Sequence, residues 1–169
     1  MNYIKIYAPD VVNGKGTRIT VFVSGCEHKC PGCYNQYSWN AAHGIPFTDD
    51  TLQYVIDTLN DKRIKYRGLS LTGGDPLSPA NLSAVYRLLR RVRRDAPHAD
   101  VWLWTGYSAD RLSARQRVIY RMCDYVVDGL YIQELRTKQL AWRGSSNQRL
   151  IDVKRSLAAD TIIPEEFDR

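Results

Sequence analysis

The sequence lacks any apolar run near the ~18 residues that a membrane-spanning helix needs. Its first residues, MNYIKIYAPD, also lack the basic and then apolar build of a secretory signal peptide. We therefore expect a cytoplasmic protein with no membrane partner. No internal repeat, linker or low-complexity tract divides the 169 residues, which are enough for one hydrophobic core. We expect a single domain over residues 1–157 and a loosely ordered tail over 158–169.

Cysteine is scarce, with four in the chain, and three of them lie close together in the stretch CEHKCPGCYN. These three are Cys26, Cys30 and Cys33, whereas Cys123 stands alone. In a reducing cytoplasm, closely spaced cysteines bind metal or perform chemistry more often than they form disulfides.

A net charge of +6 permits an acidic partner but is too small to indicate nucleic-acid binding. The basic stretch 87–95 has apolar residues at helical spacing, which favours a solvated outer helix face over partner docking.

Strand and helix patterns alternate along the chain. Apolar and β-branched runs predict four strands, and a fifth is weaker: residues 18–25, 67–76, 99–107, 124–131 and 149–153. Helical spacing follows Thr48 and recurs after Ser78, where proline follows the expected N-cap. Ser113 and Gln116 form a capping box for a third helix. The alternation predicts an α/β fold with a parallel sheet and right-handed crossovers.

The chain is shorter than the ~200 residues that a full eight-unit barrel needs. We therefore expect an incomplete, TIM-like barrel of parallel strands or an open doubly wound sheet. In both folds ligands bind at the carboxyl ends of the strands. This rule places the loops 26–33, 73–76, 105–107 and 128–129 at one edge of the sheet as the site. Cys123 precedes its strand, so it should lie at the opposite edge as a buried, inert side chain.

Three thiolates without a fourth cysteine nearby restrict the kinds of metal site. A structural zinc site is normally closed by four ligands, and an electron-transfer iron–sulfur cluster also takes four cysteines. Three ligands suggest a cluster with one open iron that binds a substrate or cofactor. His28 is a rival fourth ligand, but its place inside the tight loop favours an exposed position or a supporting hydrogen bond.

The spacing C-x-x-x-C-x-x-C after the first strand resembles the signature of the radical S-adenosylmethionine (SAM) superfamily. The stretch GGDP after the second strand resembles the glycine-rich motif of that superfamily, although alone it reads as a plain turn before a helix. Longer blocks from about residue 11 to 153 resemble the activating proteins of anaerobic (class III) ribonucleotide reductases: VNGKGTRITVFVSGC, CPGCYN, SLTGGDPL, WLWTGY, VVDGLY and WRGSSNQR.

The resemblance implies that the three clustered cysteines hold a 4Fe–4S cluster and that SAM binds the open iron. One electron, from a donor such as flavodoxin or ferredoxin, would cleave SAM to methionine and a 5′-deoxyadenosyl radical. That radical would take a hydrogen atom from a glycine in the large subunit of the reductase. The chain would thus be an oxidoreductase, a radical SAM activating enzyme that leaves a glycyl radical on its partner.

The resemblance also implies SAM contacts in each loop of the expected edge: Tyr34, Asn35, Gly73, Gly74, Asp75, Thr105, Asp128, Ser145 and Asn147. Tyr34 would contact the adenine, because glycine stands where many radical SAM enzymes have an aromatic residue. Asp75 and the glycine pair would receive the SAM amino group. Asp128 would bind a ribose hydroxyl or a small cation, or serve only as a turn residue.

Two further stretches have family roles beside simpler interpretations. RGSSNQR would line the SAM pocket or meet the glycine loop of the partner, or it is a plain connecting loop. NGKG is a glycine turn, and it is a poor phosphate-binding loop because no helix follows it. The resemblance implies that it shapes the entry to the site near Arg18.

Three other functions stay open. A small electron carrier would need Cys123 or His28 as a fourth ligand. A zinc-binding nucleic-acid module would need a second pair of cysteine or histidine ligands, which the sequence lacks. Activation of a formate-lyase type of glycyl-radical enzyme is the nearest rival. Those relatives often carry an eight-cysteine insert for which this chain has no room.

Overall fold

The computed structural model describes residues 1–165 and 167. These residues form one seven-stranded sheet in the order β3-β1-β2-β4-β5-β6-β7. The strands are β1 (Asn2–Asp10), β2 (Arg18–Val23), β3 (Ile45–Pro46), β4 (Gly68–Gly73), β5 (Asp100–Trp104), β6 (Tyr125–Asp128) and β7 (Arg149–Asp152). The helices are α1 (Asp49–Leu59), α2 (Leu82–Asp95), α3 (Ala114–Tyr120) and α4 (Val153–Ala159).

The four predicted central strands are confirmed as parallel neighbours, β2, β4, β5 and β6. The fifth predicted strand also forms, as β7, but it runs antiparallel to β6. A parallel return needs a crossover that spans the sheet, usually a helix, and the segment between β6 and β7 contains only a short 3-10 turn. The sequence prediction missed β1, which pairs antiparallel with β2. The fold is therefore mixed α/β with an open, partly parallel sheet.

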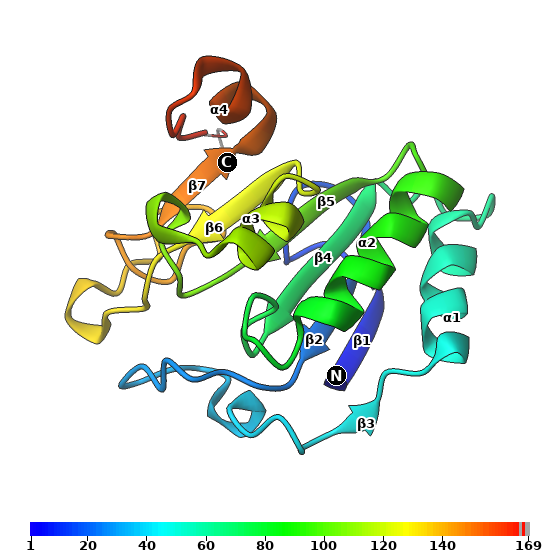
Figure 1. The fold of residues 1–169 in the computed structure, drawn as a ribbon, viewed down its shortest axis with the longest axis horizontal. Helices are drawn as coiled ribbons and strands as arrows, with labels where there is room; N and C mark the ends of the chain where they lie inside the picture. Colours follow the sequence, from blue (N-terminus) through cyan, green and yellow to red (C-terminus); the bar gives the residue numbers. More distant parts are fainter. Residues whose placement is uncertain (166, 168–169) are drawn as a thin grey trace.

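Helices α1, α2 and α3 lie together on one face of the sheet (Figure 1), so the doubly wound alternative, with helices on both faces, is wrong for this chain. Alternate side chains of β2, such as Ile19, Val21 and Val23, are fully buried in the main core with these helices. The other face carries a smaller cluster around Trp102, Val127 and Leu150. This arrangement leaves the strand ends free to hold the site.

Two of the three predicted helix starts are confirmed. The Thr48 side chain caps α1, and Ser113 with Gln116 forms the capping box of α3. The predicted cap at Ser78 is wrong, because α2 begins after Asn81. The Asn81 side-chain amide donates to the carbonyls of Ser24 and Asp75, at 2.8 and 2.9 Å. Residues 75–81 therefore form a turn that binds the site loops before the helix begins.

The described part of the predicted tail lies against β7. Pro164 forms a β-bridge with Ile151, and the Glu165 amide donates to the Leu150 carbonyl at 2.7 Å. The Phe167 ring packs in the cluster around Trp102, with centroids 5.9 Å apart. In residues 1–165 and 167, no helix has the length and apolar character to cross a membrane.

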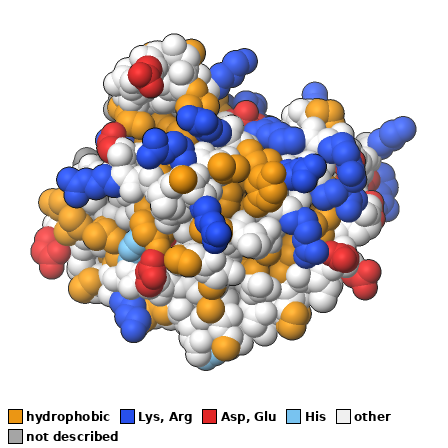
Figure 2. Space-filling model, in the orientation of Figure 1, with side chains coloured by type: hydrophobic (Ala, Val, Ile, Leu, Met, Phe, Trp, Pro, Cys, Tyr) orange, Lys and Arg blue, Asp and Glu red, His pale blue; other side chains and the backbone are white. Residues whose placement is uncertain are grey.

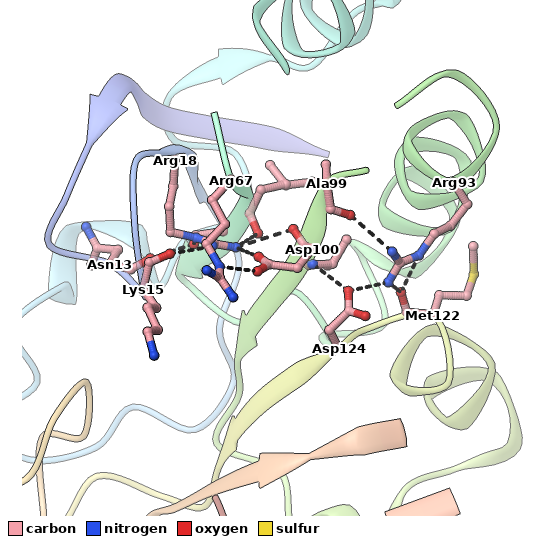
Figure 3. Close-up of polar contacts among 12 residues, drawn as sticks. Asn13, Lys15, Arg18, Arg67, Arg93, Ala99, Asp100, Met122 and Asp124 are labelled. Atoms are coloured by element: carbon pink, nitrogen blue, oxygen red, sulfur yellow. Dashed lines mark hydrogen bonds and ion pairs between the residues drawn. The ribbon is translucent and has the colours of Figure 1, made fainter. Parts of the chain in front are cut away.

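A buried polar network joins strands at the amino-terminal edge of the parallel strands (Figure 3). Arg18 is fully buried at the start of β2 and forms an ion pair with Asp100 at 2.6 Å. Its Nε donates to Ser70 Oγ at 2.7 Å, and its Nη1 donates to the Lys15 carbonyl at 3.0 Å. The NGKG loop is therefore fixed at the edge opposite the end of β2. The expectation that it shapes the entry to the site is wrong for this reason.

Candidate functional site

The loop with the three clustered cysteines follows the carboxyl end of β2. Its base is fixed by two backbone hydrogen bonds, Gly25 N to Ser38 O and Cys26 N to Trp39 O, at 2.7 and 3.0 Å. A turn closed by Cys33 N and Cys30 O, at 3.1 Å, brings the last two cysteines together. All three cysteines are partly exposed residues. The loop thus presents three sulfur ligands at the expected edge of the sheet.

The chemistry of these ligands fits a 4Fe–4S cluster. Among residues 1–165 and 167, no three His, Cys, Asp or Glu side chains converge as ligands of one metal ion. A 4Fe–4S cluster makes a different demand, because each cysteine binds a different iron atom. The Asn35 amide already lies 3.4 Å from Cys33 Sγ as a hydrogen-bond donor. Burial raises the pKa of Cys26 to about 11, so ligand formation there must displace a proton.

Asp75 lies at the centre of the strand-end loops with only 1% of its surface exposed. Its carboxylate accepts hydrogen bonds from Leu77 N at 2.8 Å, from Thr105 Oγ1 at 2.9 Å and from Gly106 N at 2.9 Å. His28 Nε2 lies 2.8 Å from the same carboxylate. Thr105 and Asp75, both predicted as site residues, are therefore together, but the carboxylate is already bound by four donors of this chain.

Two side chains that the sequence analysis gave no role, or only a minor one, hold the cysteine loop from within. His28 and Glu27 both lie between Cys26 and Cys30. The Tyr107 hydroxyl donates to Glu27, and the Tyr107 ring packs edge-on against His28 with centroids 4.4 Å apart. No sequence signal identified Tyr107 as a partner, because the contact depends on which strand ends meet.

The glycine pair allows the ends of β2 and β4 to approach closely. Gly73 has φ +97°, and a Cβ there would lie 2.9 Å from the backbone of Phe22. A Cβ on Gly74 would lie 2.7 Å from the Gly25 carbonyl oxygen, just before the first cysteine. Both positions therefore require glycine on steric grounds, whatever binds nearby.

Asp128 ends β6 and is also buried, with 1% of its surface exposed. It binds the Arg149 guanidinium in two places, at 3.0 Å through Oδ1 and 2.5 Å through Oδ2, and accepts from Ala109 N at 2.8 Å. The hydrogen bonds that Arg149 donates to Asp128 raise the pKa of Arg149 above its usual range. The cation beside Asp128 is thus a side chain of this protein, and the sequence analysis missed Arg149.

The segment 129–148 lies beside the cysteine loop. Ser145 is fully buried, and its Oγ accepts from Ile132 N at 3.2 Å. Asn147 is exposed and donates to the Leu130 carbonyl at 2.8 Å. A pocket between this segment and the loop is lined by Gly32, Cys33, Tyr34, Asn35, Tyr131, Arg136, Thr137, Lys138 and Gly144. Tyr34 itself is 99% exposed. The structure therefore brings every predicted site residue to the same edge but leaves Tyr34 open to solvent.

Comparisons with known proteins identify the family of this chain. Residues 12–151 match the family described as a 4Fe-4S single cluster domain. Over 148 residues, which are 88% of this chain and 96% of the relative, the chain is 49% identical to the anaerobic ribonucleoside-triphosphate reductase-activating protein of Escherichia coli (strain K12). The protein of the same name from Vibrio cholerae is 52% identical over the same shares. That of Enterobacteria phage T4 is 46% identical over 89% of this chain and 93% of its own length. The chain therefore belongs to the family of anaerobic ribonucleoside-triphosphate reductase-activating proteins.

Proposed function

We propose that this protein is the radical SAM enzyme that generates the glycyl radical on the large subunit of an anaerobic ribonucleotide reductase in the cytoplasm. The observation that carries the proposal is the position of the three-cysteine loop. It packs directly on the glycine-rich turn after β4, through His28 and Asp75 and through the Asp75 amide, which donates to the Gly25 carbonyl at 2.8 Å. A cluster ligand set and a glycine-lined turn thus share one edge of the sheet, as SAM chemistry at a cluster requires.

Cys26, Cys30 and Cys33 would hold the 4Fe–4S cluster, leaving one iron open for SAM. When bound, the cluster supplies the single electron that cleaves SAM, and a donor of the flavodoxin or ferredoxin type would replace it. The backbone exposed at Gly73 and Gly74 would approach the SAM amino group. Tyr34 and Asn35 would lie along the adenine in the pocket beside Cys33.

The remaining predicted contacts would act through the protein rather than on SAM. Thr105 binds the Asp75 carboxylate, and Asp128 binds Arg149, so both would fix the strand ends that surround the pocket. Ser145 and Asn147 hydrogen-bond the backbone of Ile132 and Leu130, so they would fix the shape of segment 129–148. This segment would contact the glycine loop of the reductase as that loop enters the site.

The partner follows from the open edge of the sheet. A carbon radical must be kept from water and from side reactions. The cysteine loop is partly exposed, so another molecule would have to cover it during the reaction. The relatives are named for the reductase that they activate, which identifies the protein that would close this edge.

The test is anaerobic reconstitution with iron and sulfide, followed by reduction in the presence of SAM and the reductase. We expect SAM cleavage and a glycyl-radical doublet in the EPR spectrum of the reductase. A reconstituted protein that carries the cluster but cleaves no SAM would leave an electron carrier as the better description. SAM cleavage without a glycyl radical on any anaerobic reductase would refute the activating role.

A further inference from the structure

Asp75 connects three segments that come from different parts of the chain. Its own segment follows β4, Thr105 and Gly106 follow β5, and His28 belongs to the cysteine loop after β2. The carboxylate is nearly inaccessible to water, so its hydrogen-bond donors are groups of this chain. Each of these hydrogen bonds ties the segment that carries the donor to Asp75. Among these donors His28 alone comes from the cysteine loop, since Leu77 lies two residues from Asp75 in the same turn.

The His28 side chain is well placed for this contact. It is 13% exposed, and its ring is held between the Asp75 carboxylate and the Tyr107 ring. A Cβ on Gly106 would lie 2.5 Å from the His28 ring, so the backbone after β5 approaches the imidazole as closely as glycine allows. To donate to Asp75, His28 must carry a proton on Nε2.

The part of the loop between Cys26 and Cys30 has few other anchors. Cys26 N is bound at the base of the loop by Trp39 O, and a backbone group of Tyr131 hydrogen-bonds the Cys30 thiol. Lys29 adopts φ +48°, in the left-handed region that side chains rarely occupy. A strained backbone of this kind persists only where the surrounding contacts determine it. His28 and Glu27, the two residues that precede Lys29, supply those contacts.

We propose that His28 is a positioning residue whose hydrogen bond to Asp75 sets the separation between the cysteine loop and the glycine-rich turn. The inference rests on the proposed function, in which SAM must meet the cluster and that turn at the same time. The position of one loop relative to the other then decides how tightly SAM binds. Asp75 accordingly acts by orienting His28, Thr105 and Gly106 rather than by receiving the SAM amino group.

The test compares His28→Phe with His28→Gln. Phenylalanine keeps a flat ring against Tyr107 but cannot donate, whereas glutamine keeps a side-chain N–H donor at a similar reach. His98→Phe is the matched control, because His98 Nε2 also makes one hydrogen bond, to Leu59 O at 3.1 Å, at the opposite edge of the sheet. Each reconstituted protein is assayed for iron content and, by anaerobic equilibrium dialysis, for SAM affinity.

We expect His28→Phe to raise the dissociation constant for SAM about tenfold or to prevent stable iron loading, because a buried charged acceptor loses its donor. His28→Gln should load iron fully and bind SAM within about threefold of the unaltered protein. His98→Phe should change neither quantity. The proposal is overturned if His28→Phe loads iron and binds SAM like the unaltered protein. It is equally overturned if His28→Gln is as impaired as His28→Phe, since the donor would then be irrelevant.

A double-mutant cycle separates positioning from a direct contact of Asp75 with SAM. If His28 acts through Asp75, then Asp75→Asn combined with His28→Phe should weaken SAM binding no more than the stronger single change. Additive losses would show two independent contributions and would contradict the proposed route. An unaltered protein that loads iron but binds no SAM would instead refute the proposed function, so the two failures are distinguishable.

Discussion

Cys123 differs from the three clustered cysteines in its surroundings rather than in its chemistry. Its side chain is 5% exposed, and its Sγ donates to the Ile119 carbonyl at 3.4 Å. Burial strongly raises the pKa of its thiol, which therefore stays protonated at neutral pH. It lies beside Asp124, at the edge of the sheet that also holds Arg18 and Asp100. A buried thiol at the far edge of the sheet cannot reach the cysteine loop to complete its ligand set.

Serine substitutions test this distinction. We expect Cys26→Ser, Cys30→Ser and Cys33→Ser each to abolish the visible absorbance of the reconstituted cluster, because each removes the ligand of one iron atom. Cys123→Ser should leave both the absorbance and the iron content unchanged. Loss of the cluster in Cys123→Ser would show that a fourth cysteine ligand exists and would contradict the three-ligand site.

At the scale of the elements, β2, β4 and β5 are joined at their amino-terminal ends by a buried charge. Arg18 reaches across β4 to Asp100, which also binds Arg67 at 2.9 Å on its more exposed side (Figure 3). Desolvation lowers the pKa of Arg18, and the Asp100 carboxylate opposes that shift. This network fixes the amino-terminal ends of β2, β4 and β5 relative to one another. It therefore also helps to set how their carboxyl ends are aligned at the site.

Removal of the Asp100 charge should therefore be costly. We expect Asp100→Asn to lower the free energy of unfolding by about 3 kcal/mol, because it leaves the buried Arg18 guanidinium without its counter-charge. Asp61→Asn is the control, since Asp61 pairs with Arg63, whose side chain is 88% exposed, and ion pairs in water contribute little to stability. Urea unfolding of both variants measures the difference. Equal effects would show that the network adds nothing beyond a surface ion pair.

The segment after α4 is a second element whose role can be measured. Phe167 lies 5.4 Å from the Tyr125 ring and 5.6 Å from the Trp142 ring, centroid to centroid. We expect Phe167→Ala to lower the free energy of unfolding by about 1–2 kcal/mol, because it removes aromatic packing from a half-buried position. The change should also appear in tryptophan fluorescence. An unaltered unfolding midpoint and spectrum would agree with the loosely ordered tail expected from the sequence.

For the whole molecule, much of the basic charge of α2 is paired with acidic side chains of the same chain. Basic side chains gather over the α2 side of the face in Figure 2. Most of those on α2 pair with aspartates of this chain: Arg87 with Asp49, Arg91 and Arg94 with Asp95, and Arg93 with Asp124. These pairs support the interpretation of residues 87–95 as a solvated outer face.

What the sequence could predict depended on whether the cause was local. The cysteine spacing and the capping box at Ser113 arise within a few residues, so they were readable. The steric need for Gly73 depends on the backbone of Phe22 in another strand, so it was not. The antiparallel direction of β7 depended on the absence of a crossover helix in segment 129–148. The engagement of Asp75 by His28 and of Asp128 by Arg149 depended on which strand ends meet. Both aspartates were predicted at the site, but only the fold shows that their carboxylates are already occupied.

The edge of the sheet around the cysteine loop is open, so a partner protein should affect the reaction there. Since the three cysteines are partly exposed, SAM cleavage should be slow when this protein is alone, and it should not lead to hydrogen-atom transfer from a partner. Addition of the anaerobic reductase should accelerate cleavage, because the partner excludes water and supplies the hydrogen atom. SAM consumption and the glycyl-radical EPR doublet are measured together, with a formate-lyase type of glycyl-radical enzyme as the control. A doublet of equal size on the control enzyme would contradict the reductase as the specific partner while leaving the radical chemistry intact. Cleavage that is equally fast with no partner would show instead that the edge needs no second molecule to close it.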